Sequence, residues 1–498
     1  MNAVLAPRDF HPDIAELTDR QLLRELSYID GRWTAGADGK TFEVSDPACA
    51  RPIAWVASLE AGQAGSAIDA AANALPGWRS ALPQERSRLL RRWHDLVVSA
   101  RRDLARLLTL EQGKPLAEAL GEIDYAASFI EWFAEEGRRL NTESVTSHLA
   151  DAEMVVRREA LGVAAVITPW NFPSAMITRK AAAALAAGCT VVAHPSCEAP
   201  LSALALAELA ERAGIPPGVF NVVTGDPAAI VGCLTDDVRV RALSFTGSTE
   251  IGRLIAPRSA ASMKRLVMEL GGHAPFIVFA DADPDEAARL AVDAKFATSG
   301  QDCLAANRIY VERPVLATFL ERFAARIAQL RVGPGAELGV DIGPLVHERA
   351  MAKIEAQVAD ARTRGARLVV GGARHSAGPL FYQPTLLANV PDEALIMRQE
   401  TFGPVAAVAA FDSETEVIAR ANDSEYGLCA YVVTANGARQ KRLARALEYG
   451  MVAVNRVKIT GGPVPFGGWK QSGVGREGSR HGLDAFSELK YICFDSVI

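Results

Sequence analysis

The 498-residue sequence has no apolar segment long enough to cross a membrane, because Pro, Gly or a charged residue interrupts each of its longest apolar runs. Its first residues lack the basic-then-apolar pattern of a secretory signal, since Arg8, Asp9, His11 and Asp13 interrupt it. No basic patch stands out, and the formal net charge is −6. We therefore expect neither a membrane nor a nucleic acid as a partner.

The spacing of the cysteines excludes two further classes of site. The chain has seven of them, namely Cys49, Cys189, Cys197, Cys233, Cys303, Cys429 and Cys493. An odd number at wide and irregular intervals argues against a disulfide framework and against a zinc site. We therefore expect no metal, and a location in the reducing cytoplasm.

The length of the chain predicts two or three domains, because 498 residues exceed what a single core usually holds. The first 27 residues are polar with helical stretches, and we interpret them as a loosely held arm. Residues 28–33 and 41–44 are typical of short strands joined by a Gly-rich turn. Helical spacing of apolar residues then predicts helices over residues 66–78, 84–113 and 116–140.

From residue 163 the pattern changes to strands that alternate with helices. The expected strands are 163–167, 190–193, 219–223 and 242–245. This alternation implies right-handed crossovers and a parallel sheet, with ligands at the carboxyl ends of the strands. Residues 144–158 and 488–498 also alternate between apolar and polar, which indicates two further strands.

The second half of the chain repeats the alternation from about residue 274, which indicates a second α/β unit. The expected strands are 277–279, 308–311, 368–370 and 451–455. The expected helices are 315–330, 348–364 and 437–449, together with one that carries Cys303 between the first two strands.

The stretch Ser299-Gly300-Gln301-Asp302-Cys303-Leu304 places one cysteine in an otherwise small and apolar segment. A thiolate there would be a strong nucleophile. A lone cysteine is more often a buried structural residue, so the interpretation depends on other motifs. The motifs around it are Pro169-Trp170-Asn171-Phe172-Pro173, Phe245-Thr246-Gly247-Ser248-Thr249, Glu269-Leu270-Gly271-Gly272 and Glu400-Thr401-Phe402-Gly403-Pro404.

Together these five ordered motifs resemble the aldehyde dehydrogenase superfamily, from about Tyr28 to near the C-terminus. The resemblance implies an α/β fold with a Rossmann-type NAD(P)-binding domain, an α/β catalytic domain and a small oligomerisation sheet. The implied division is 1–143 with 160–272 for the cofactor domain, 273–480 for the catalytic domain, and 144–159 with 481–498 for oligomerisation. A homodimer or homotetramer is implied.

The resemblance also assigns the chemistry to three residues. Cys303 attacks the aldehyde carbon, while the Asn171 amide and the Cys303 backbone N–H stabilise the developing negative charge. After hydride transfer to nicotinamide, Glu269 activates the water that hydrolyses the thioester. Taken alone, Glu269 also suits a strand end, and Asn171 suits a turn between two prolines.

The stretch Gly247-Ser248-Thr249-Glu250-Ile251-Gly252 follows an expected strand and opens a helix, where backbone N–H groups favour a phosphate. It lacks the spacing of the common dinucleotide fingerprint, so the resemblance carries the assignment to NAD or NADP. The implied cofactor-binding residues are Ile167, Trp170, Asn171, His194, Ser196, Cys197, Gly225, Phe245, Gly247, Ser248, Ile251, Leu270, Glu400 and Phe402. His194 stands where the family usually has lysine, and Cys197 where it has Glu or a small residue. We therefore expect weak discrimination between NAD and NADP.

The amino-acid sequence of four segments resembles the succinate-semialdehyde dehydrogenase branch of the family, namely residues 174–180, 186–189, 447–450 and 475–480. In that branch the arginine at Arg179 binds the distal carboxylate of the substrate, a role that suits a guanidinium fork. Taken alone, Arg179 is equally typical of an exposed helix face.

Three departures from the branch matter, of which the first leaves its carboxylate clamp incomplete and the second removes a local Cys–Cys redox lock. A second arginine of the branch is Ala297 here, and a second cysteine after the nucleophile is Ala305. The third brings Arg456 and Lys458, which are either substitutes for the missing arginine or solvated loop cations. The implied substrate-binding residues are Arg179, Arg456, Lys458, Thr460 and Phe466.

The predicted function is NAD(P)-dependent oxidation of a short anionic aldehyde, succinate semialdehyde first, to the carboxylic acid. The alternatives left open are a sulfonated, longer dicarboxylic or aromatic aldehyde and, outside the enzymes, a catalytically silent homologue. Glu269, as a hydrolytic base, argues against transfer of the acyl group to coenzyme A.

Overall fold

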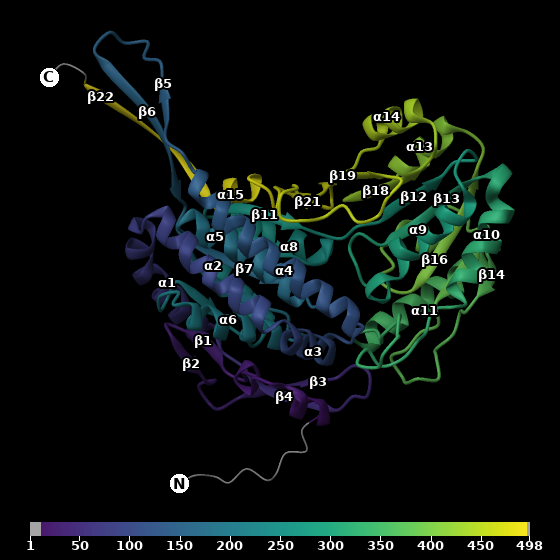
Figure 1. Cartoon of the computed structure of the whole chain (residues 1–498), viewed down its shortest axis with the longest axis horizontal. Helices are drawn as coiled ribbons and strands as arrows, with labels where there is room; N and C mark the ends of the chain where they lie inside the picture. Colours follow the sequence, from purple (N-terminus) through teal and green to yellow (C-terminus); the bar gives the residue numbers. More distant parts are fainter. Residues whose placement is uncertain (1–10, 496–498) are drawn as a thin grey trace.

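The computed structural model describes residues 11–495, in which two large sheets form separate bodies of the molecule (Figure 1). The first sheet contains β1 (Ser27–Ile29), β2 (Arg32–Thr34), β7 (Val163–Thr168), β8 (Thr190–Pro195), β9 (Phe220–Val222), β10 (Val240–Thr246), β11 (Arg265–Glu269) and β21 (Gly473–Val474). Its order is β2-β1-β9-β8-β7-β10-β11-β21. The four expected strands β7 to β10 are parallel, as the alternating pattern predicts, and β11, which was not among the expected strands, joins them in parallel.

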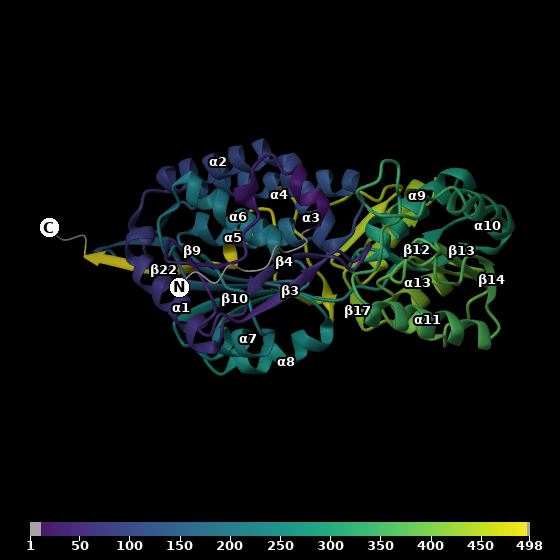
Figure 2. The same ribbon diagram turned by 90° about the horizontal axis from the view of Figure 1, so that it is seen from below.

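Helices cover both faces of this sheet, because successive strand residues point to opposite sides. Ala164 and Val166 pack into one core with α2 (Pro83–Ser99), α4 (Leu116–Glu136), α5 (Pro173–Ala187) and α6 (Leu201–Ala213). Ala165 and Ile167 pack into the opposite core with α1 (Ala61–Ser80), α7 (Pro227–Asp236) and α8 (Thr249–Ala260). Figure 2 shows α2 and α4 to α6 above the sheet and α7 and α8 below it.

The single helix expected over residues 84–113 is two helices, α2 and α3 (Arg101–Gln112), that meet at Ala100. The backbone of Ala100 has φ −88° and ψ 7°, which ends α2 and turns the chain into α3. The apolar spacing continues across this break, so periodicity alone does not reveal it. Gly113 ends α3 in the left-handed conformation, with φ 91°.

The second sheet is parallel except for one edge strand. It contains β12 (Ala274–Val278), β13 (Ala306–Glu312), β14 (Arg367–Val370), β15 (Thr385–Ala388), β16 (Val405–Phe411), β18 (Cys429–Val433) and β19 (Met451–Val454). The order is β14-β15-β16-β13-β12-β18-β19, with β14 antiparallel to β15. The helices around this sheet are α9 (Pro284–Phe296), α10 (Arg313–Ile327), α11 (Glu348–Thr363), α12 (Leu395–Arg398), α13 (Glu414–Asn422) and α14 (Gly437–Ala446), whereas α15 (His481–Asp484) packs against α5 of the first body.

Cys303 does not lie on a helix, so that expectation is wrong. The helix α9 ends at Phe296, and a short 3-10 turn, η4 (Ala297–Gly300), follows it. Thr298 and Ser299 adopt left-handed backbone conformations with φ 51° and 57°, which a continuing helix cannot accommodate. Cys303 therefore sits in a loop that leads into β13.

The two alternating segments pair as predicted in a three-stranded sheet. It has the order β22-β6-β5, formed by β5 (Glu143–Val145), β6 (Ala152–Ala160) and β22 (Ser487–Asp495). Figure 1 shows these strands extending away from the main body. Residues 496–498 of the expected tail strand lie outside the described residues. The division of the chain into three domains stays a prediction.

The described part of the N-terminal arm is packed against the body. Its two 3-10 turns are η1 (Pro12–Glu16) and η2 (Arg20–Leu22), and Leu22 is fully buried. Arg24 donates to Glu208 at 2.6 Å, and the backbone N–H of Asp19 donates to Asp103 at 2.8 Å. The interpretation as a loosely held arm is therefore wrong for residues 11–27, and residues 1–10 lie outside the described part.

Two further strand pairs complete the fold, and neither belongs to a large sheet. They are β3 (Thr41–Ser45) with β4 (Pro52–Ala57) and β17 (Tyr426–Gly427) with β20 (Trp469–Lys470). Across residues 11–495, no helix is both long enough and apolar enough to span a bilayer.

Candidate functional site

Cys303 lies where two cavities meet. The turn cavity, of about 310 Å³, is lined by Asn171, Gly247, Glu269, Glu400 and Cys303 among others. The arginine chamber, of about 570 Å³, is lined by Arg179, Lys458, Thr460, Phe466 and Cys303 among others. A thiol at this junction can react with a molecule in the arginine chamber while that molecule faces a second one in the turn cavity.

The turn cavity forms where the carboxyl ends of three parallel strands meet. Asn171 follows β7, Gly247 follows β10, and Glu269 is the last residue of β11. Thr246 at the end of β10 is the pairing partner of Glu269 at the end of β11. The turn after β10 therefore begins beside the Glu269 carboxylate. The sequence pattern predicts this convergence for Asn171 and Gly247, because parallel strands end at one edge of a sheet, and β11 adds Glu269 to the same edge.

Hydrogen bonds on both sides hold the loop that carries Cys303. The Gln301 side chain donates to the Pro344 carbonyl at 3.2 Å and accepts from the Val346 N–H at 3.1 Å. After the cysteine, Tyr431 donates to the Leu304 carbonyl at 2.9 Å. A Cβ on Gly272 would lie 2.1 Å from the Cys303 carbonyl oxygen, so only glycine allows this approach.

Asn171 is positioned by a buried ion pair. Lys114 donates to the Asn171 carbonyl at 2.7 Å and to Glu122 at 2.6 Å. Glu122 in turn accepts from the Ser174 N–H at the start of α5. The Asn171 amide donates to the Gln301 carbonyl at 3.1 Å, while its own oxygen has no partner among the described residues. The amide has a second hydrogen, which remains available to a ligand.

Burial controls the protonation of Cys303 and Glu269. It raises the pKa of the Cys303 thiol well above its usual range, and the carboxylates of Glu269 and Asp302 raise it further. Burial also raises the pKa of Glu269 to about 8, against the opposing effect of Arg179. Neither Glu269 oxygen has a hydrogen-bond partner within residues 11–495. Both groups therefore hold their protons at neutral pH, and Glu269 is poised to exchange its proton near pH 8.

Half of the predicted cofactor-binding residues lie around the turn cavity. The lining includes Trp170, Asn171, Gly247, Ser248, Leu270, Glu400 and Phe402. Glu400 accepts from the Gly272 N–H at 2.9 Å. The rings of Trp170 and Phe402 meet edge to face at 5.4 Å.

The other predicted cofactor-binding residues are not brought to the turn cavity. Ile167 and Phe245 are buried in the sheet, and Ile251 is 44% exposed on α8. His194 is buried, with its Nδ1 3.0 Å from the Val223 carbonyl oxygen. Burial lowers the pKa of His194, so its ring is neutral at neutral pH.

Cys197 and Gly225 line a separate acidic cavity at the ends of β8 and β9. This cavity, of about 490 Å³, is also lined by Glu43, Glu111, Glu198 and Asp226. Ser196 donates to Glu198, and Arg349 of α11, 3.7 Å from Glu198, connects this cavity to the lining of the turn cavity. These acids were missed by the sequence reasoning, because they come from separate segments of the chain with no shared spacing.

Arg179 is buried in the wall of the arginine chamber. Its Nε lies 2.6 Å from Glu477 Oε2, and its guanidinium carbon lies 4.1 Å from the centre of the Phe466 ring. Lys180 also contacts Glu477, so two cations share one carboxylate. Arg179 is therefore buried, and the alternative that it lies on an exposed helix face is wrong.

The loop cations differ in their placement. Lys458 and Thr460 line the arginine chamber, and both are exposed. Arg456 is not part of this lining, and its Nε donates to the Lys458 carbonyl at 3.0 Å. Of the two substitutes proposed for the missing arginine, only Lys458 faces the chamber.

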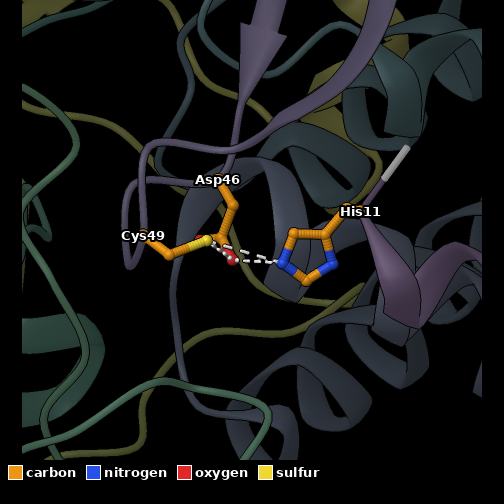
Figure 3. Close-up of side chains that lie close together, drawn as sticks. All are labelled: His11, Asp46 and Cys49. Atoms are coloured by element: carbon orange, nitrogen blue, oxygen red, sulfur yellow. Dashed lines mark hydrogen bonds and ion pairs between the residues drawn. The ribbon is translucent and has the colours of Figure 1, made fainter. Parts of the chain in front are cut away.

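One cluster outside these cavities has side chains that can ligate a metal ion. His11, Asp46 and Cys49 lie together at the arm (Figure 3), with His11 Nε2 3.2 Å from Asp46 and 3.5 Å from Cys49. His11 Nδ1 accepts from the Asp13 N–H at 3.3 Å, so the ring proton is on Nε2 and faces Asp46. The cluster is therefore satisfied as a hydrogen-bonded contact that ties the arm to the turn before β4.

Comparison with known proteins gives a consistent result over nearly the whole chain. The model of the aldehyde dehydrogenase family matches residues 33–492. The non-phosphorylating aspartate-semialdehyde dehydrogenase of Halomonas elongata is 54% identical over 482 residues, which cover 97% of this chain and 98% of the relative. The NADP(+) succinate-semialdehyde dehydrogenase GabD of Escherichia coli is 50% identical over 478 residues, 96% of this chain and 99% of the relative. A solved structure described as an Escherichia coli NADP-dependent enzyme superposes with a TM-score of 0.95 at 50% identity, covering 96% of this chain and 100% of the other.

Proposed function

The chain belongs to the aldehyde dehydrogenase family, and we propose that it uses NAD or NADP to oxidise a short anionic aldehyde to the carboxylic acid. The observation that carries this proposal is the position of Cys303 between the turn cavity and the arginine chamber. An aldehyde held in the arginine chamber then presents its carbonyl to the thiol and its hydrogen to the turn cavity.

The residues around the turn cavity fit a dinucleotide. Ser248 caps α8 and lines the turn cavity together with Gly247, so the start of this helix, where backbone N–H groups favour a phosphate, lies at the cavity. The Glu400 carboxylate is an acceptor suited to ribose hydroxyls. Bound NAD or NADP would supply the acceptor for the hydride.

Cys303 forms the covalent intermediate in this proposal. Its thiolate attacks the aldehyde carbon, and the carbonyl oxygen becomes an alkoxide that the Asn171 amide and the Cys303 N–H stabilise. Loss of hydride converts the thiohemiacetal to a thioester. The unpartnered Asn171 oxygen and the spare amide hydrogen leave this group free to engage a ligand.

Glu269 acts as the base of the second half-reaction. Its carboxylate takes a proton from water, the hydroxide attacks the thioester carbon, and the acid leaves with the Cys303 thiolate restored. A pKa of about 8 matches this role, because a base works best when its pKa lies near the working pH.

The substrate is bound through Arg179, which pairs its distal carboxylate. The two relatives named above act on different four-carbon semialdehydes, one derived from an amino acid and one from succinate. Both fit a chamber with a buried guanidinium in its wall.

The cofactor preference we propose is NAD over NADP. The acidic cavity carries Cys197 at the position where the family distinguishes the two cofactors. Glu43, Glu198 and Asp226 line the same cavity, and their charge opposes a 2′-phosphate while it tolerates a ribose hydroxyl. This refines the expectation of weak discrimination.

A homo-oligomer built on the projecting sheet is proposed as well. Leu489 and Tyr491 of β22 are 55% and 56% exposed. Exposed apolar side chains that cluster on one element often mark a protein–protein interface. A monomer mass in sedimentation at micromolar concentration would remove this proposal. We place the enzyme in the reducing cytoplasm, because a catalytic thiol must remain unoxidised.

The proposal as a whole is tested by a panel of aldehydes with NAD and with NADP, followed by absorbance of the reduced cofactor. Succinate semialdehyde is expected to exceed butanal, its uncharged four-carbon analogue, in kcat/KM. Equal values would contradict the proposal of an anionic substrate. If no aldehyde is turned over, the alternative of a catalytically silent homologue is supported instead.

A further inference from the structure

The arginine chamber contains an acid beside the nucleophile as well as the guanidinium in its wall. Asp302 precedes Cys303 and lines the same chamber as Arg179. One Asp302 oxygen accepts from the Leu304 N–H at 3.0 Å. Within residues 11–495, Asp302 forms no ion pair, although it carries a carboxylate next to the reacting sulfur.

The other acids of this chamber are already engaged. Glu118 accepts from the Thr298 N–H with both oxygens at 3.0 Å, and burial raises its pKa to about 7. Glu122 is paired with Lys114, and Asp293 lies 2.7 Å from an arginine one helical turn away, Arg289. Within residues 11–495, Asp302 and Glu118 both lack an ion-pair partner, but both Glu118 oxygens are taken by the Thr298 N–H, which leaves Asp302 with a free carboxylate oxygen.

The negative charge of Asp302 opposes the chemistry of its neighbour. It raises the pKa of the Cys303 thiol, and so disfavours the thiolate that attacks the aldehyde. It also repels a substrate whose only charge is negative. Both effects are reduced when a positive group binds beside Asp302.

We propose that the substrate is a 2-amino acid whose side chain ends in the aldehyde, with its carboxylate at Arg179 and its ammonium at Asp302. This inference rests on the proposed function, and it adds the ammonium to the substrate class. In a four-carbon substrate of this kind, the carbon that bears the ammonium is two bonds from the carbon that Cys303 attacks. The ammonium therefore falls beside the residue adjacent to the nucleophile.

The test compares L-aspartate 4-semialdehyde with succinate semialdehyde, which differ only in the 2-amino group. The wild-type kcat/KM is expected to be at least about ten-fold higher for the amino substrate, on the scale of one charge-assisted hydrogen bond. In Asp302→Asn this ratio is expected to fall at least about ten-fold, mainly through KM. Any change in thiol reactivity affects both substrates and cancels in the ratio.

Asp293→Asn is the matched control, because it removes an acid of the same chamber that already has an arginine partner. Its substrate ratio is expected to stay at the wild-type value. Competitive inhibition of the wild type by L-2-aminobutanoate and by butanoate needs no variant, and the amino compound is expected to bind at least about ten-fold more tightly.

The outcomes separate this inference from the function on which it rests. If the wild type oxidises succinate semialdehyde as well as the amino substrate, and Asp302→Asn leaves the ratio unchanged, the ammonium site is overturned and the dehydrogenase stands. Tighter binding of butanoate than of L-2-aminobutanoate overturns it as well. If butanal is oxidised as efficiently as either acid, the proposal of an anionic substrate is wrong, and the inference that depends on it is wrong as well.

Discussion

Arg179 and Glu477 form a buried ion pair in the wall of the chamber that holds the nucleophile, with 2.6 Å between Nε and Oε2. Burial alone would lower the pKa of Arg179, but Glu477, together with Tyr125, Glu269 and Cys303, raises it above its usual range. Lys180 contacts the same carboxylate. One positive charge of this trio is therefore left for a ligand.

Arg179→Met is expected to raise the KM for succinate semialdehyde by tens of fold, and that for butanal by much less. The lost partner is a charge-assisted hydrogen bond, which contributes about 1.5–3 kcal/mol. Met replaces the apolar stem, and Lys180 continues to pair Glu477, so the fold is expected to survive. Steady-state kinetics with both aldehydes checks the selectivity.

Lys458 and Arg456 supply a matched pair for the same experiment. Lys458→Ala is expected to weaken the anionic aldehyde selectively, because Lys458 lines the chamber. Arg456→Ala is expected to resemble the wild type, since its guanidinium is bonded to the Lys458 carbonyl instead. If Arg179→Met, Lys458→Ala and Arg456→Ala all treat the acidic and neutral aldehydes alike, the substrate is neutral.

Cys303→Ala is expected to abolish aldehyde oxidation while NAD binding survives, because only the covalent step is lost. The loop should keep its position, since Gln301 and Leu304 hold it rather than the thiol. Activity assays and calorimetric titration with NAD measure the two properties separately. Turnover by the variant would remove Cys303 from the mechanism.

Glu269→Gln is expected to give a burst of reduced cofactor followed by slow turnover, because water activation comes after hydride transfer. In the wild type, steady turnover should rise with pH toward about 8, where the Glu269 carboxylic acid loses its proton. This rise should be lost in Glu269→Gln. Stopped-flow absorbance from pH 6 to 9 tests both statements.

Loss of the burst as well would assign Glu269 an earlier role, in deprotonating the thiol. Iodoacetamide alkylation of Cys303 distinguishes the two. Above about pH 8, where Glu269 is charged, the variant lacks that charge, so the pKa of Cys303 is lower and alkylation should be faster, unless Glu269 is the base that ionises the thiol.

The sequence predicts the convergence of Asn171 and Gly247 because it depends on strand alternation, a local property that fixes which ends share an edge, whereas Glu269 was expected there only from the family resemblance. The placement of Cys303 on a helix fails because Thr298 and Ser299 are left-handed, although their side chains have no special preference for that conformation. Tertiary contacts of Gln301 hold the loop, and no local pattern encodes them.

Charge relationships between distant segments are the part of the site that the sequence does not reveal. Arg179 and Glu477 are separated by almost 300 positions, yet they share one buried ion pair. Glu43 of β3, Glu198 and Asp226 come from three separate segments and meet only in the folded chain. Such pairs depend on the final packing, so spacing rules cannot find them without a structure.

The cofactor preference depends on the acidic cavity. We expect the wild type to bind NAD about ten-fold or more tightly than NADP, which corresponds to about 1.4 kcal/mol per ten-fold. Glu198→Gln is expected to reduce this ratio, because it removes one of the charges that oppose the 2′-phosphate. Calorimetric titration measures binding of each cofactor without turnover.

Two comparisons make that experiment decisive. Glu321→Gln removes an equal charge from α10, outside the acidic cavity, and its ratio should match the wild type. Equal or tighter binding of NADP by the wild type would contradict the proposal and indicate a cation at the 2′ position. Arg349 is the candidate, because its side chain is 83% exposed and only 3.7 Å from Glu198. Arg349→Ala would then lose affinity for NADP but retain affinity for NAD.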